Sequence, residues 1–124
     1  MRNSRTYLAA IAAVAVLSMS GPALAHARLV KSNPPKNAVV ASPKAITLTF
    51  DDKLVAAFST FTVTMPMGSQ NMNVPVKTHL DKGGKTLTGI PSGKLAPGSY
   101  VVHWTAAAAE DGHKMTGELP FRVK

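Results

Sequence analysis

His26 and the tripeptide Asp111-Gly112-His113 carry the side chains of this sequence that are best suited to bind a metal ion. An imidazole nitrogen and a carboxylate oxygen can bind one ion when a tight turn brings them together, and Gly112 relieves the backbone of such a turn. If His26 begins the processed chain, its α-amine adds a second nitrogen, and a pKa of about 8 lets a metal displace the amine proton near neutral pH. Cu(II) favours a tetragonal set of nitrogen and oxygen donors, so these residues predict a Cu(II) site.

The first 25 residues have the features of a secretory signal peptide. A start with two arginines precedes a short apolar segment at residues 7–19, and Ala23-Leu24-Ala25 fits the small-residue pattern that signal peptidase reads. The apolar segment is too short to span a bilayer comfortably. We therefore expect export and a periplasmic location.

Cleavage after Ala25 makes His26 the new N-terminus and leaves residues 26–124, a length that suits one compact domain. Ala25-His26-Ala27 fits the same cleavage pattern, however. Cleavage after Ala27 would remove the histidine, so the sequence leaves both products open.

Composition excludes several classes of protein. The chain has no cysteine, which excludes disulfides and any thiolate metal site. Without the two arginines of the signal segment, 12 basic and 6 acidic residues remain, for a net charge of +6. The lysines lie singly between apolar residues and at turns, whereas nucleic-acid binders cluster basic residues on one face. We expect no nucleic-acid partner.

The processed chain has the pattern of short strands separated by turns rich in Pro, Gly and Asn. Alternation of apolar and polar residues is clearest at Ile46–Phe50, and Tyr100, Val102 and Trp104 share one predicted core face. Pro75 favours an edge position for its strand, and residues 106–109 are expected to form a small-residue connection. The predicted strands are 27–32, 46–50, 61–65, 74–80, 85–90, 99–105 and 118–123. Seven short strands predict an all-β, immunoglobulin-like Greek-key sandwich or barrel.

Three methionines, Met65, Met67 and Met72, fall in a stretch with Gly, Ser and Asn that we interpret as a loop. Thioethers are soft ligands that select Cu(I), so this loop is a candidate Cu(I) site. Adaptable packing is the alternative use of these side chains. His79 and His103 are predicted to be exposed rather than metal-binding, the latter because it alternates with core residues.

The chain resembles the CopC family of periplasmic copper-resistance proteins over essentially all of residues 26–124. The resemblance rests on matching stretches at 26–30, 48–50, 54–55, 95–100, 104, 111–113, 116–117 and 121–123. It implies that His26, Asp111 and His113 bind Cu(II), and that Asp52 or its neighbour Asp51 lies close by. It also implies a seven-stranded Greek-key barrel and a partner that is an inner-membrane copper transporter or another periplasmic copper protein.

The function predicted from these features is sequestration or transport of Cu(II) by a monomeric protein that is not an enzyme. An alternative from another class is a metal-independent immunoglobulin-like interaction module. A small copper oxidase of the polysaccharide monooxygenase kind also uses a terminal histidine. Such an enzyme needs a second histidine braced against the same copper and a broad substrate-facing surface, and the chain has only seven aromatic residues.

Overall fold

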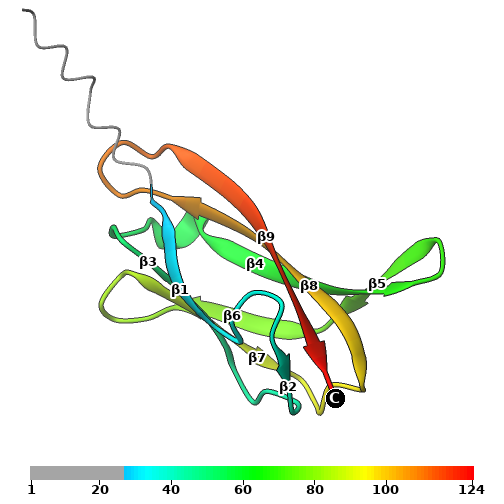
Figure 1. Cartoon of the computed structure of the whole chain (residues 1–124). Coiled ribbons are helices and arrows are strands. Elements are labelled where there is room, and N and C mark those ends of the chain that lie inside the picture. The colour runs from blue at the N-terminus through cyan, green and yellow to red at the C-terminus, as the bar shows by residue number, and fades with distance from the viewer. Residues whose placement is uncertain (1–26) are drawn as a thin grey trace, which may run out of the picture.

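The computed structural model of the protein describes residues 27–124, which form two β-sheets packed face to face around one core (Figure 1). Nine strands and one short 3-10 helix, η1, make up this part of the chain. In chain order they are β1 (Leu29–Asn33), β2 (Val39–Val40), β3 (Ile46–Phe50), η1 (Ala56–Phe58), β4 (Thr60–Met67), β5 (Gln70–Val74), β6 (Val76–Leu80), β7 (Thr86–Pro91), β8 (Gly98–Ala107) and β9 (Lys114–Val123).

The two sheets have four and five strands. The first has the order β1-β3-β7-β6 and the second the order β2-β9-β8-β4-β5. All neighbours are antiparallel except β2 and β9, which pair in parallel over two residues. Pro75 separates β5 in one sheet from β6 in the other, and β6 is an edge strand, as the proline predicts.

The core forms because alternate residues of each strand point inward. Ile46, Leu48 and Phe50 of β3 are buried, while the threonines between them are half-buried on the outer face. On the predicted inner face of β8, Tyr100 and Val102 are buried as expected, while Trp104 is half-buried and packs against the edge of the core. The Tyr100 hydroxyl donates a hydrogen bond to the carbonyl of Ala96 at 2.6 Å, and burial raises the pKa of this phenol.

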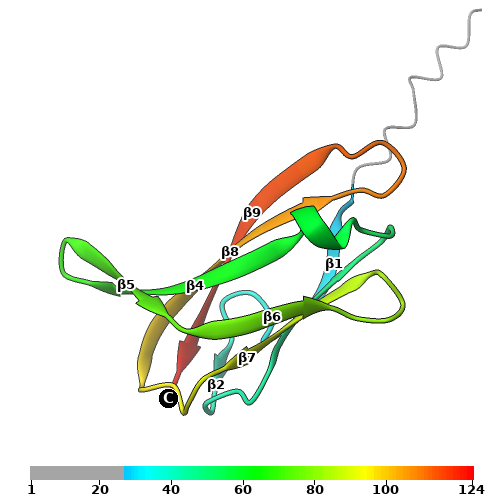
Figure 2. The same ribbon diagram turned by 180° about the vertical axis from the view of Figure 1, so that it is seen from behind.

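The all-β, two-sheet architecture and all seven predicted strands are confirmed, but two further strands were not expected. Only two residues long, β2 shows no alternation from which it could be predicted. All residues of β5 are polar except Met72 and Val74, and four of the five are exposed, so it lacks the apolar face of a half-buried strand. The predicted methionine loop is therefore wrong: its residues form the β4–β5 hairpin, which projects from the sandwich in Figure 2.

The expected small-residue connection at residues 106–109 is also wrong in part. Ala106 and Ala107 are the last residues of β8, and Ala108 continues as an isolated bridge to Leu54. All three alanines are completely buried. Their small side chains let the segment around Leu54 pack directly against the end of β8.

Helices contribute little to the described part of the chain. Across residues 27–124, the structure contains no helix with the length and apolar character needed to cross a bilayer.

Candidate metal centre

The Asp-Gly-His sequence forms a tight turn between β8 and β9. The backbone N–H of His113 donates to Asp111 Oδ1 at 2.9 Å, and Gly112 has a φ of +70°, which glycine adopts without steric cost. Two backbone hydrogen bonds close the base of the turn, from Gly112 N–H to the Ala108 carbonyl and from Ala108 N–H to the His113 carbonyl. Asp111 and His113 are both exposed. The hydrogen bonds of the turn define the backbone that carries these two side chains.

The first described residues of the chain, Ala27 to Leu29, also have defined contacts with the rest of the domain. Ala27 is buried in the core. The backbone N–H of Arg28 donates to Asp51 Oδ1 at 2.8 Å, and the Asp51 N–H donates back to the Arg28 carbonyl at 3.0 Å. Leu29 then pairs with Phe50 in the β1–β3 ladder. The backbone two residues after His26 therefore has a defined position.

A short segment after β3 connects the start of β1 to the Asp-Gly-His turn. Asp51 bonds to Arg28, as described, and two residues later the Lys53 carbonyl accepts a hydrogen bond from Ala109 N–H at 2.8 Å. Leu54 forms the bridge to Ala108 beside it. The beginning of β1 and the β8–β9 turn accordingly lie at the same end of the sandwich (Figure 1).

His26 and the predicted signal peptide, residues 1–25, lie outside the described residues. Cleavage after Ala25, or after Ala27, remains a prediction. Within residues 27–124 there is no group of three or more His, Cys, Asp or Glu side chains that could hold a metal ion. Asp111 and His113 offer one carboxylate and one imidazole, and a metal site at this turn would need further ligands from outside residues 27–124 or from solvent.

The two candidate acidic residues after β3 have different roles. Asp52 Oδ1 accepts a hydrogen bond from the backbone of its neighbour Lys53 at 2.8 Å, whereas Asp51 Oδ1 accepts one from the backbone of Arg28, two residues after His26. The family resemblance left Asp52 and Asp51 as alternatives. Phe50 of β3 pairs with Leu29 of β1, and Asp51 is the next residue after Phe50. This pairing brings the Asp51 carboxylate, and not that of Asp52, to the backbone of β1.

Lys114 follows His113, and its ammonium group lies over an aromatic ring. Lys114 Nζ is 5.0 Å from the ring centroid of Phe58 in η1. A cation in this position is attracted by the electron-rich face of the ring. The ammonium group of Lys114, next to the Asp-Gly-His turn, therefore packs against Phe58 of η1.

The three methionines lie at the other end of β8. Met65 and Met72 are directly opposite each other in the β4–β5 ladder, and Met67 is two residues along on the same face. Met67 and Met72 are 51% and 54% exposed, while Met65 packs against the core with its terminal methyl over Gly98. Since Gly98 and Ala107 are at opposite ends of the ten-residue β8, the two groups of candidate ligands are about 30 Å apart.

The remaining histidines lie on the outer faces of the two sheets. His103 contacts Glu118 through Nδ1 at 3.3 Å and Thr64 through Nε2 at 2.9 Å. Its outward position confirms the prediction from alternation. His79 lies in β6, and its Nε2 is 3.2 Å from Asp81 Oδ1.

Comparison with known proteins gives matches over nearly the whole chain. A profile of the CopC domain matches residues 29–124. Copper resistance protein C from Xanthomonas campestris pv. juglandis is 34% identical over 97% of both chains, and its namesake from Pseudomonas syringae pv. tomato is 34% identical over the full length of both. The crystal structure of PcoC, a methionine-rich copper resistance protein from Escherichia coli, matches with a TM-score of 0.73 and 36% identity, covering 81% of this chain and all of that one.

Proposed function

The chain belongs to the CopC family, and on this premise we propose that it is a periplasmic protein that binds Cu(II) through His26, Asp111 and His113 for copper resistance or homeostasis. Its relatives are named as copper resistance proteins, which supports a function connected with copper. The observation that carries the specific proposal is the shared location of the β1 start and the Asp-Gly-His turn, linked through residues 51–54.

The donor types support Cu(II) as the ion. The α-amine and imidazole of His26, the carboxylate of Asp111 and the imidazole of His113 would form a set of nitrogen and oxygen ligands without sulfur. Divalent copper has the highest affinity of the first-row divalent ions for such donors and prefers a tetragonal arrangement. Four protein donors fill the tetragonal positions, which favours holding the ion over a reaction that needs an open position.

The direct test is an EPR spectrum of Cu(II)-loaded protein isolated from the periplasm, with its first residue established by intact mass. We expect one equivalent of copper, a tetragonal signal and hyperfine couplings from nitrogen. Weak, heterogeneous binding to a chain that begins at His26 would contradict the proposal and favour a metal-independent interaction module. Glycan cleavage by the copper-loaded protein would favour the oxidase alternative.

Asp51 has a positioning role in the proposed site. Its carboxylate binds the backbone of residue 28, and Asp51→Ala removes this hydrogen bond without removing any proposed ligand. Loss of outer-shell partners typically costs about 10–100-fold in metal affinity. We expect a decrease in Cu(II) affinity of about tenfold or more, measured by competition with a Cu(II) chelator.

Asp52→Ala is the matched control, because it removes the same charge one residue away but leaves the contact with β1 intact. Its Cu(II) affinity should fall less than that of Asp51→Ala, because the Asp52 carboxylate accepts its hydrogen bond from Lys53 and not from Arg28. Equal losses in both variants would mean that Asp51 acts through charge and not through the Arg28 backbone.

The β4–β5 hairpin supports a second, weaker site for Cu(I). Three thioethers share one face, two of them are exposed, and soft thioether sulfur selects Cu(I) over Cu(II). Packing explains Met65, which covers Gly98, but it does not account for exposed methionines at two neighbouring positions.

Replacement of Met67 and Met72 by leucine tests this Cu(I) site, since leucine keeps the apolar volume and removes the sulfur. We expect at least a tenfold loss of Cu(I) affinity under anaerobic competition with a Cu(I) chelator, with unchanged Cu(II) binding. Met115→Leu, in β9 beside the other end of the sandwich, is the control. Unaltered Cu(I) binding by the double variant would leave these methionines a packing role only.

A further inference from the structure

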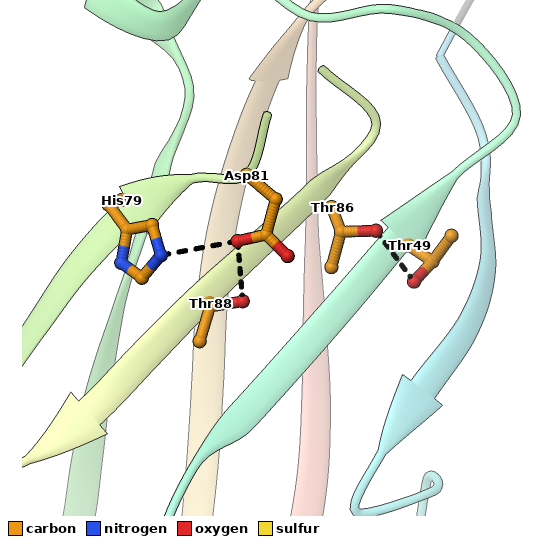
Figure 3. A network of polar contacts seen from close by, with 5 residues as sticks. All are labelled: Thr49, His79, Asp81, Thr86 and Thr88. Carbon is orange, nitrogen blue, oxygen red and sulfur yellow. Dashed lines mark hydrogen bonds and ion pairs between the residues drawn. The ribbon is translucent and has the colours of Figure 1, made fainter. Parts of the chain in front are cut away.

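A second imidazole–carboxylate pair lies outside the proposed copper site, on the outer face of the four-stranded sheet. His79 in β6 and Asp81, two residues later, point toward each other (Figure 3). The distance from His79 Nε2 to Asp81 Oδ1 is 3.2 Å, and the two side chains are 60% and 42% exposed. The pair is therefore open to ions in solution.

Asp81 is held in place by its neighbours. Its Oδ1 accepts a hydrogen bond from the Thr88 hydroxyl at 2.9 Å, on the adjacent strand β7 (Figure 3). Its backbone N–H donates to the Thr86 carbonyl at 2.8 Å, and its carbonyl accepts from Gly84 N–H at 2.9 Å. His79 is itself directly opposite Thr88 in the β6–β7 ladder. The carboxylate and the imidazole are thus supported by one rigid hairpin.

We propose that His79 and Asp81 form a second Cu(II)-binding site, with water completing the coordination. Zinc, a divalent ion similar in size to copper, bonds imidazole nitrogen at about 2.0–2.1 Å and carboxylate oxygen at about 2.0–2.2 Å. Two such bonds to atoms 3.2 Å apart enclose an angle of about 100°, close to that of adjacent ligands in a tetragonal complex. Copper would take the place of the hydrogen between Nε2 and Oδ1; in a neutral ring that proton moves to Nδ1, and from an imidazolium it passes to solvent.

The pair formed by His103 and Glu118 provides an internal comparison. It has a similar separation of 3.3 Å, but both nitrogens of the His103 ring are engaged, since Nε2 also contacts the Thr64 hydroxyl. Copper binding there would require loss of a partner at one nitrogen and a bond through Nδ1, the nitrogen nearer the backbone. We expect copper to bind the His79 pair and not this one.

Nearby positive charge makes the second site weaker than the proposed terminal site. Lys77 is two residues before His79 on the same face of β6, and Lys82 directly follows Asp81. Both disfavour the approach of a cation, and the site offers only two protein donors. It should therefore fill after the first equivalent of Cu(II).

Amide N–H correlation spectra of the processed protein during Cu(II) titration test the proposal residue by residue. Paramagnetic copper broadens signals near it, so the first equivalent should affect the turn around His113. The second should broaden signals of residues 78–82 and Thr88. In His79→Gln the signals of residues 78–82 and Thr88 should stay sharp at two equivalents of Cu(II). Thr88→Val removes the hydroxyl that supports Asp81, so it should weaken binding of the second equivalent about tenfold.

The His103→Gln variant is the matched control and should retain both binding events. The proposal is overturned if the second equivalent broadens the His103 and Glu118 signals instead, or if His79→Gln leaves the second event unchanged. Absence of the first event alone would count against the terminal site only. The two conclusions can therefore be separated in one experiment.

Discussion

A single glycine added before His26 is expected to lower the Cu(II) affinity of the processed protein at least about 100-fold. The extension converts the α-amine of His26 into an amide, which removes one proposed donor and the chelate ring that it forms with the imidazole. Changes to groups that only support metal ligands already cost about 10–100-fold, so loss of a ligand should exceed that range. Chelator competition measures the affinity, and EPR should show altered nitrogen couplings.

A cleavable extension provides the control for this experiment. Proteolysis that regenerates His26 as the first residue should restore the affinity, which excludes misfolding as the cause of the loss. Retention of wild-type affinity in the extended protein would contradict a role for the terminal amine. Intact mass must accompany both measurements, because cleavage after Ala27 would give a chain without the histidine.

Phe50→Ala is expected to cost about 3–5 kcal/mol of folding stability, the usual range for removal of a buried phenylalanine. Phe50 is 1% exposed, and its ring packs edge-on against Trp104 with the centroids 5.1 Å apart. For a domain of this size, such a loss should lower the Tm by at least about 12 °C in thermal unfolding of the metal-free protein. Because Asp51 follows Phe50 directly, the cavity would also loosen the support of Arg28.

Ile90→Ala is the matched control on a neighbouring strand, since Ile90 is an exposed apolar residue of β7. It should cost clearly less than Phe50→Ala, because Ile90 is 45% exposed to solvent and its removal leaves no enclosed cavity. Similar Tm values for the two variants would contradict the central position of Phe50 in the core.

The sequence was sufficient to predict the strands whose two faces differ. In β3, β4 and β8, apolar and polar residues alternate, and the hydrophobic effect requires the apolar set to face inward whatever the neighbours are. Local chemistry also identified the turn at Gly112, because a left-handed backbone favours glycine there. The nitrogen and oxygen donor types in His26, Asp111 and His113 likewise needed no tertiary information.

Contacts between residues distant in the sequence decided the rest. Nothing local distinguishes Asp51 from Asp52, and only the pairing of β3 with β1 determines which carboxylate meets Arg28. The methionine segment lacks an apolar face of its own and becomes β5 because β4 supplies hydrogen-bond partners along its length. A strand of this kind is stabilised by its neighbour and not by its own pattern, and so its existence depends on the tertiary structure.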